Sequence, residues 1–262
     1  MRPKLLVEQQ VNASLWNRRL TLKMKVGYKA LSVSILALIA SLYSIDNCLN
    51  FAQAKEESLS KDCPLHVGKE GYHKSFAGAD KWVKKFDDPA RDKWQMPKEV
   101  ISALKIDKDD KIADIGAGTG YFSLRIARAY PDATVYGADV EPDMITYLKQ
   151  QAKQQHLSNH KAVMLPTDNP ALPAKVNLVL VVDTYHHISH RISYFAALKK
   201  HLMPDARVAI IDFTAQSPEG PPPEHRLSKA DLTEEMKEAG YGISEDVELL
   251  PYQYFLVFKP NK

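Results

Sequence analysis

The chain has 262 residues, of which 45% are hydrophobic and 26% are charged. This composition is typical of a globular protein with a sizeable core, and the length suits one large α/β domain with accessory segments. The formal net charge is only +3, and no basic stripe follows the N-terminal region, so nucleic acid is not expected as an obligate partner. The two cysteines, Cys48 and Cys63, both precede the predicted sheet, which excludes a disulfide framework or a cysteine–zinc knuckle as its support.

An apolar run near the N-terminus, residues 30–43 (ALSVSILALIASLY), follows several lysines. The run is shorter than the roughly 20 residues that a membrane-spanning helix needs, and its basic flank is typical of a signal-peptide core. Ala52-Gln53-Ala54 offers a small-x-small cleavage site. We therefore expect residues 1–54 to be a signal peptide or a membrane anchor, with a mitochondrial presequence or a buried amphipathic helix as the alternatives.

This segment determines where the rest of the chain is expected. Because positive charge stays on the cytoplasmic side, a cleaved signal or an anchor would leave the main domain exported, periplasmic or membrane-anchored. Residues 30–43 are then the part of the chain that would associate with a membrane. The domain is cytoplasmic only if the signal interpretation is wrong.

Residues 55–96 are interpreted as a polar arm followed by a helical cap. Two short helices are predicted within residues 77–106, and the first carries Trp82 and Phe86 on one side. The second has Pro97 near its first turn, where the missing N–H costs little. We expect the segment between them to lie over the mouth of the site, with Trp94 and Gln95 as lid residues.

From residue 111 onwards, predicted strands alternate with predicted helices. Residues 243–258 contain two strands too close together for a crossover connection, so they are expected to form an antiparallel hairpin. Alternating strands and helices predict an α/β, doubly wound, Rossmann-like sheet with right-handed crossovers over residues 97–262. The other predicted strands are 111–115, 133–139, 161–165, 176–183 and 206–213, and the helices are 121–130, 141–155, 190–202 and 228–240.

A glycine-rich loop, ADIGAGTGYF (113–122), joins the first strand to its helix. A strand that turns through glycines into a helix aims free backbone N–H groups at a ligand, and the glycines allow close approach. Asp139 ends the second strand beside this loop, where a carboxylate can accept hydrogen bonds from ribose hydroxyls. The two features together indicate a nucleoside-bearing cofactor; the alternative is a tight turn without a ligand.

The spacing of the glycines distinguishes between cofactors. Gly116, Gly118 and Gly120 do not fit the G-x-G-x-x-G pattern of NAD enzymes. The negative charge of Asp114 faces the loop and would repel a pyrophosphate. The same charge would attract a ligand with a positive group beside its ribose. S-adenosylmethionine carries both an ammonium and a sulfonium.

The stretch ADIGAGTGYFS resembles the first motif, acid-x-G-x-G-x-G, of class I S-adenosylmethionine-dependent methyltransferases, and residues 97–258 match that family's order of seven strands with an antiparallel last strand. The segments DTYHHISHRISYF and RVAIIDF resemble bacterial members that act on small molecules. The resemblance implies a set of cofactor-binding residues: Gly116, Gly118 and Gly120 around the methionine moiety, Asp114 near its ammonium, Asp139 on the ribose, Val140 against the adenine, Asp168 at the adenine amino group, and Asp183 in the fourth motif.

Methyl transfer is an in-line displacement, so placing both reactants in a dry pocket provides much of the catalysis. The predicted fourth strand ends in DTYHHISH (183–190), and open α/β sheets carry their chemistry at that edge. His186 is predicted to act as a base, with Tyr185 as its orienting partner; a packing role for His186 is the alternative. No metal site is predicted, although His186, His187, His190 and Asp183 form the alternative cluster.

The predicted acceptor is a small or lipid-like molecule. The chain lacks the Asn/Asp-Pro-Pro-aromatic tetrad of amino-methylating enzymes, and it has no cysteine beyond Cys63 to act on cytosine. Arg91 or Arg191 could pair with an acidic substrate or lie on the surface, and residues 220–225 (GPPPEH) are either a stiff rim of the cleft or a plain linker. Two alternatives to a methyltransferase remain: a non-catalytic S-adenosylmethionine-binding protein and an NAD-dependent oxidoreductase.

Overall fold

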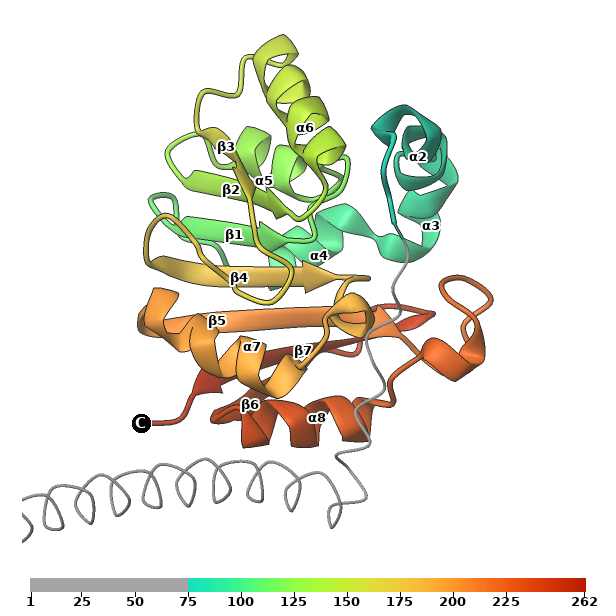
Figure 1. Cartoon of the computed structure of the whole chain (residues 1–262), viewed down its shortest axis with the longest axis vertical. Coiled ribbons are helices and arrows are strands. Elements are labelled where there is room, and N and C mark those ends of the chain that lie inside the picture. Colours follow the sequence, from blue (N-terminus) through green and yellow to red (C-terminus); the bar gives the residue numbers. More distant parts are fainter. Residues whose placement is uncertain (1–74) are drawn as a thin grey trace, which may run out of the picture. The chain divides into compact units, whose positions relative to one another are not determined.

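The computed structural model describes residues 75–262 (Figure 1). The predictions for residues 1–54 and for the first part of the arm therefore lie outside the described residues. The described part is built around a seven-stranded sheet in the order β3-β2-β1-β4-β5-β7-β6. None of its helices has the length and apolar composition that crossing a membrane requires.

Five strands of the sheet run parallel and are joined by crossovers. β7 lies antiparallel to both β5 and β6, which places the last strand between the two that precede it. The predicted α/β sheet, mostly parallel with an antiparallel C-terminal hairpin, is thereby confirmed. The strands are β1 (Lys111–Ile115), β2 (Thr134–Asp139), β3 (His160–Met164), β4 (Val176–Val182), β5 (Leu202–Phe213), β6 (Tyr241–Asp246) and β7 (Gln253–Pro260).

Helices cover both faces of the sheet, because the central strands are apolar on both sides. In β4, Leu178 and Leu180 pack with α4 (Pro97–Ala103) and α5 (Ser123–Ala129), whereas Val179 and Val181 pack with α7 (Arg191–Leu198) and α8 (Lys229–Glu238). The alternation follows directly from the two-residue period of a strand. A further helix, α6 (Pro142–Gln154), packs on β2 and β3.

The cap contains one more helix than the sequence predicts. α2 (Ala79–Phe86) is followed by a 3₁₀ turn (Pro89–Arg91) and by α3 (Asp92–Gln95), before α4 begins at Pro97. The Asp88 side chain accepts a hydrogen bond from the N–H of Ala90 at 2.8 Å, and Pro89 is the first residue of the turn. A side-chain cap followed by proline starts a helical turn, so the expected connecting loop is helical instead.

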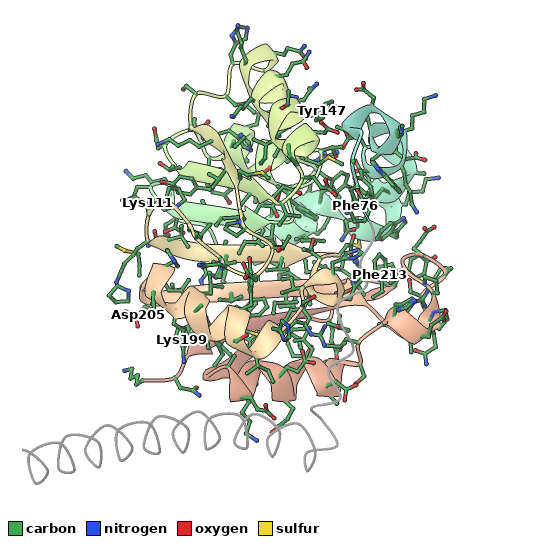
Figure 2. The ribbon with its side chains drawn as sticks, viewed as in Figure 1. Phe76, Lys111, Tyr147, Lys199, Asp205 and Phe213 are labelled. Atoms are coloured by element: carbon green, nitrogen blue, oxygen red, sulfur yellow. The ribbon has the colours of Figure 1, made fainter. Side chains whose placement is uncertain are left out.

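The parallel strands all end at one edge of the sheet, which we call the carboxyl edge. Figure 2 shows Phe76, which precedes α2, and Phe213, the last residue of β5, toward this edge, with Lys111, the first residue of β1, at the opposite one. Ligands of open α/β sheets bind at the carboxyl ends of the strands. The cap therefore covers the edge where a site is expected.

Candidate functional site

The glycine loop between β1 and α5 packs closely on the end of β4. Gly116, Gly118 and Gly120 have φ angles of 77°, 53° and 90°, in the left-handed region that side-chain-bearing residues rarely adopt. A Cβ added to Gly116 would lie 2.2 Å from Oγ1 of Thr184. This position therefore requires glycine for both conformation and space.

Asp114 lies behind the glycine loop, near the end of β1. The side chain is buried, and its Oδ2 accepts a hydrogen bond from the backbone N–H of Ser123 at 3.0 Å. Burial raises the pKa of Asp114 to about 7; the Ser123 hydrogen bond opposes this shift and the nearby Asp139 adds to it. A cation bound in the loop would favour the ionised form, so this carboxyl group is suited to a positively charged ligand.

Asp139 and Val140 follow one another where β2 ends. Asp139 accepts hydrogen bonds from the N–H of Gly118 at 2.8 Å and from the N–H of Glu141 at 3.0 Å, so it holds the glycine loop in place. Burial raises its pKa. Val140 is 42% exposed and offers apolar surface beside this carboxylate, as a flat base next to a ribose would need. Asp168 is exposed in the connection from β3 to β4.

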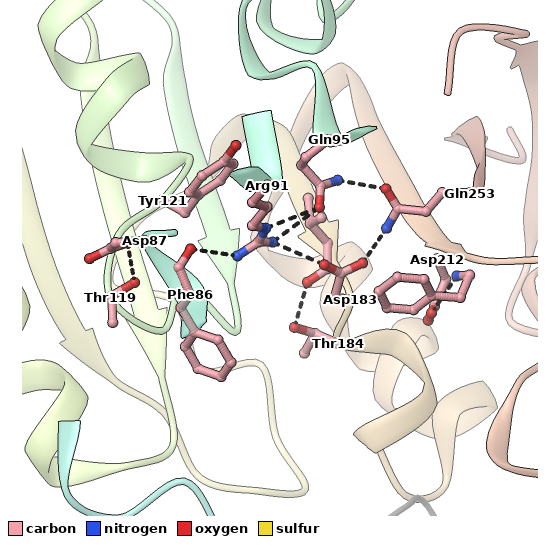
Figure 3. A network of polar contacts seen from close by, with 12 residues as sticks. Phe86, Asp87, Arg91, Gln95, Thr119, Tyr121, Asp183, Thr184, Asp212 and Gln253 are labelled. Atoms are coloured by element: carbon pink, nitrogen blue, oxygen red, sulfur yellow. Dashed lines mark hydrogen bonds and ion pairs between the residues drawn. The ribbon is translucent and has the colours of Figure 1, made fainter. Parts of the chain in front are cut away.

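A polar network links the cap to the ends of β4 and β7 (Figure 3). Asp183, directly after β4, accepts a hydrogen bond from Arg91 Nη2 at 2.9 Å and another from the side-chain amide of Gln253. The amide of Gln95 donates to Gln253 Oε1 at 2.7 Å. Residues from the cap, β4 and β7 are thus tied together at the carboxyl edge.

The charge of Asp183 is balanced by its surroundings. Burial raises the pKa of this carboxyl group to about 7, the Arg91 guanidinium opposes the shift, and the Asp212 carboxylate adds to it. Asp183 also has a φ of 54°, a conformation that aspartate and asparagine tolerate better than most residues. The protonation state of Asp183 therefore depends on the charges that lie beside it.

His186 is oriented by Asp212, which ends up beside it because β5 pairs with β4. Nδ1 of His186 lies 2.9 Å from both carboxylate oxygens of Asp212. Burial lowers the pKa of His186, but the Asp212 carboxylate outweighs this effect, and the pKa is raised overall. His186 is only 4% exposed, so the His186–Asp212 pair is buried at the carboxyl edge.

Tyr185 is not the orienting partner of His186 that the sequence analysis predicts. Its hydroxyl donates to Glu235 Oε2 at 2.9 Å, and its ring stacks on Phe195 with centroids 5.1 Å apart. Arg191 also donates to Glu235, at 2.6 and 2.7 Å, so it is neither on the surface nor directed at a substrate. Tyr185 follows β4 on the face that α7 and α8 cover, which turns its side chain away from the site.

A hollow of about 710 Å³ lies beside this network. Gln253 and Tyr254 of β7 form one wall, and Tyr254 pairs with Asp212 in the sheet. The remaining lining is largely apolar and includes Met96, Leu227, Val247, Leu249, Leu250 and Pro251. The hollow therefore adjoins the His186–Asp212 pair and the cap.

The proline-rich segment 220–225 is not part of that lining. Arg226 instead donates hydrogen bonds to the carbonyls of five residues and folds the segment back on the end of β5; these are Thr214, Ala215, Ser217, Glu219 and Pro221. Of the two lid residues predicted, Trp94 lies 5.9 Å from the ring of Phe213, and Gln95 is buried in the network. Within residues 75–262 no three histidine, cysteine, aspartate or glutamate side chains are arranged to share a metal ion.

Sequence reasoning missed Asp212 and Gln253 and gave no role to the Arg91–Asp183 ion pair. Asp212 was detectable in principle, as the one acidic residue in the apolar segment 206–213. Gln253 had no such signal, since its position depends on the pairing of Phe213 with Gln253 across an antiparallel ladder.

Three comparisons define the class of protein to which this fold and site correspond. Residues 113–208 match a family model described as "Methyltransferase domain". The malonyl-[acyl-carrier protein] O-methyltransferase of Acetivibrio thermocellus is 28% identical over 105 residues, which are 39% of this chain and 36% of that protein. The chain thus spans about a third of the length of this curated relative.

Solved structures agree with the assignment. A SAM-dependent methyltransferase from Aquifex aeolicus is 25% identical and superposes with a TM-score of 0.65, covering 69% of this chain and 97% of that one. An O-methyltransferase from neocarzinostatin biosynthesis, bound to S-adenosyl-L-homocysteine and 1,4-dihydroxy-2-naphthoic acid, shares the fold at a TM-score of 0.55 and 13% identity, covering 69% of this chain and 58% of that one. Over residues 113–208 the chain is therefore similar to a methyltransferase domain, and its fold is that of an S-adenosylmethionine-dependent methyltransferase.

Proposed function

We propose that this chain transfers a methyl group from S-adenosylmethionine to a small-molecule acceptor. The observation that carries the proposal is the glycine loop, whose left-handed glycines bring no side chain to the carboxyl edge and whose shape is held by Asp139, with Asp114 behind it. The N–H groups of Gly116, Gly118 and Gly120 are bonded within the protein, so the free N–H groups expected from the sequence are not found at the three glycines. The loop would hold the methionine part, Asp139 the ribose, Val140 the adenine, and Asp168 the adenine amino group. When bound, S-adenosylmethionine supplies a methyl group activated by a positively charged sulfur.

The hollow beside Gln253 is the proposed acceptor site. Its volume of about 710 Å³ falls within the roughly 300–1,000 Å³ of small-molecule pockets, which are also mostly apolar. An acceptor with an apolar body, either a small aromatic or a lipid-like molecule, fits this lining. The lining also contains three charged residues: Lys229 and Asp246, which form an ion pair, and Glu248.

His186 and Asp212 are proposed to handle the proton of an acceptor hydroxyl or amine. With Nδ1 bonded to Asp212, Nε2 is the ring nitrogen that remains to take a proton. The raised pKa of His186 makes this nitrogen a stronger base than that of a free histidine. Because the ring is buried, the neighbouring His187 and Phe213 side chains would have to admit the acceptor.

We also propose that residues 1–54 carry an export signal or a membrane anchor, and that residues 30–43 provide any membrane association. The support is the basic flank, the short apolar run and the Ala52-Gln53-Ala54 site. N-terminal sequencing of the mature protein tests the proposal. A start at Lys55 supports cleavage, and an intact Met1 or Met24 counts against it.

The methyltransferase proposal is tested by incubating the purified protein with S-adenosylmethionine carrying a labelled methyl group and a small-molecule extract. We expect the label to appear in one or a few products, and Asp139→Ala to abolish this transfer. Binding of S-adenosylmethionine without any product would favour the non-catalytic alternative. Tight binding of NAD with none of S-adenosylmethionine would favour the oxidoreductase.

A further inference from the structure

The Arg91–Asp183 ion pair connects the cap to the end of β4. Nη2 of Arg91 lies 2.9 Å from Oδ2 of Asp183, and the two side chains are 14% and 20% exposed. The guanidinium is held independently of Asp183, since Nη1 donates to the carbonyl of Phe86 at 3.0 Å and Nε donates to Gln95 Oε1 at 3.2 Å. Breaking the ion pair therefore leaves Arg91 in position.

Arg91 lies directly over the glycine loop. Its guanidinium stacks on the ring of Tyr121, the residue after Gly120, at 4.1 Å from the centroid. Figure 3 shows Arg91 between Tyr121 and Asp183. Phe86, whose carbonyl binds Arg91, lies 3.6 Å from the position of a Cβ on Gly118. The cap thus brings a half-buried cation to the loop that is proposed to hold the amino-acid end of the donor.

Asp183 flanks the same loop from the other side. The next residue, Thr184, packs against Gly116 so tightly that no Cβ fits between them. The carboxylate and the guanidinium are therefore neighbours of the loop and carry opposite charges. An α-amino acid group presents one carboxylate and one ammonium, which are the complementary partners of Arg91 and Asp183.

We propose that Arg91 binds the carboxylate of the donor's amino-acid end and that Asp183 binds its ammonium, so that the ion pair opens when the donor enters. This inference rests on the proposed function. One ion pair is replaced by two, and no buried charge loses its partner, which matters because an unpaired buried charge is strongly unfavourable. The planar guanidinium suits a carboxylate because it can donate two parallel hydrogen bonds.

The chain provides a matched control for Arg91. Arg125 stacks on the same Tyr121 ring at 4.0 Å, but its partner is Asp92 at 3.4 Å and its side chain is 34% exposed. Replacing either arginine removes one positive charge and one stacked guanidinium from Tyr121. Only Arg91 is bonded to Asp183, so only its replacement should change recognition of a carboxylate.

The test measures equilibrium binding of two ligands to the full chain by calorimetry: S-adenosylmethionine and decarboxylated S-adenosylmethionine, which keeps the ammonium and the sulfonium. In Arg91→Met we expect the affinity for S-adenosylmethionine to fall on the order of 10- to 100-fold relative to that for the decarboxylated ligand, the range of a charged hydrogen bond, because only S-adenosylmethionine has a carboxylate for Arg91. Arg125→Met should leave the ratio of the two affinities unchanged. Asp183→Asn should weaken both ligands equally.

Arg91→Lys provides a second variant that keeps the charge without the planar fork, and it should reduce the preference for S-adenosylmethionine less than Arg91→Met does. An affinity ratio that stays at the wild-type value in both Arg91 variants overturns the inference while the proposed function stands. If the wild-type chain binds neither ligand, the proposed function itself fails, and this inference fails with it.

Discussion

The donor half of the carboxyl edge, formed by β1 and β2, is shaped mainly by glycine backbone, whereas the acceptor half, formed by β4, β5 and β7, depends on side chains. Between residues 113 and 140, the site consists of three glycines, the Asp139 carboxylate that holds the loop in shape, and the Asp114 carboxylate behind it. In the acceptor half, Asp212 lies in β5 and is bonded to His186, and Gln253 lies in β7 and is bonded to Asp183. Asp183, directly after β4, lies where the two halves meet and is also bonded to Arg91 of the cap. We therefore expect the donor half to lose stability when a side chain is added to one of its glycines, and the acceptor half to lose stability when one of its side chains is removed.

The largest effect is expected in the acceptor half, from Asp212→Ala. This change leaves the buried His186 without its carboxylate, and removing one partner of a buried pair costs about 3–5 kcal/mol of the free energy of unfolding. Asp246→Ala is the control, because its ion pair with Lys229 is 42–44% exposed and should contribute less than about 1 kcal/mol. Equal losses in the two variants, measured by chemical denaturation, would contradict the assignment of Asp212.

The His186–Asp212 pair also makes the stability of the folded chain depend on pH. The pKa of His186 is raised above its ordinary value of 6.5, so its stabilising contribution is complete below that pH and is lost as the pH rises through the raised pKa. The difference in stability between the wild-type chain and Asp212→Ala should therefore shrink from pH 6 to pH 9. Denaturation curves across this range provide the measurement.

In the donor half, Gly116→Ala is expected to have the next largest effect. The left-handed conformation costs a side-chain-bearing residue about 1–2 kcal/mol, and the Cβ would meet Oγ1 of Thr184 at 2.2 Å, which adds about 1–3 kcal/mol of overpacking. Gly118→Ala shares the strained conformation but has only an ordinary contact at 3.6 Å, so it should cost about 1–2 kcal/mol. If both variants lose the same stability, Thr184 does not define the space beside the loop.

Donor affinity should fall as the pH drops below 7, by up to about tenfold per pH unit for each carboxyl group that takes up a proton. Burial raises the pKa of both Asp114 and Asp183 to about 7, so both lose their attraction for an ammonium below that pH. Asp114→Asn should reduce the slope of affinity against pH. An affinity that stays constant between pH 8 and pH 5.5 would show that neither carboxyl group faces the donor's charge.

In the ligand-free protein, Asp114 should make stability fall as the pH rises, whereas donor affinity should rise with pH. Its folded-state pKa is above the ordinary 3.8, so the folded chain holds a proton that the unfolded chain releases, and stability falls as the pH rises from about 4 to 7. Asp114→Asn should therefore be more stable than the wild-type chain at pH 8 and lose this advantage near pH 4. Thermal unfolding at the two pH values measures the difference.

The smallest effect is expected from Tyr185→Phe, which removes the hydrogen bond to Glu235 and costs about 1 kcal/mol. Because the hydroxyl points toward α8 and not toward His186, the rate of methyl transfer should stay near that of the wild-type chain. A large fall in rate without loss of stability would restore Tyr185 as a partner of His186.

The contrast between the two halves also explains how much the sequence reveals. β1 was predicted at residues 111–115 as observed, and β2, β3 and β4 differ from prediction by a residue at their ends, because apolar runs bounded by glycine, proline or aspartate are local signals. The glycine loop and Asp139 lie within one strand–helix–strand unit, so their proximity follows from the short connection.

The acceptor half could not be assembled in this way. Asp212 reaches His186 through the parallel pairing of β4 with β5, and Gln253 reaches Asp183 because β7 inserts beside β5. Such contacts depend on register between strands distant in sequence, which a pattern of apolar residues does not specify to the nearest residue. Tyr185 was misjudged for the same reason, since the face toward which a residue turns after a strand depends on the packing of α7 and α8.

The position of β7 has a consequence for the order in which the protein forms during translation. Residues 253–260 leave the ribosome after both β5 and β6, yet β7 lies between these two strands. Until these residues emerge, β6 has no neighbour in the sheet, and the amide of Gln253 is missing from Asp183 and Gln95. A nascent chain can therefore shape its glycine loop early, but the other half of the pocket is completed in one late step.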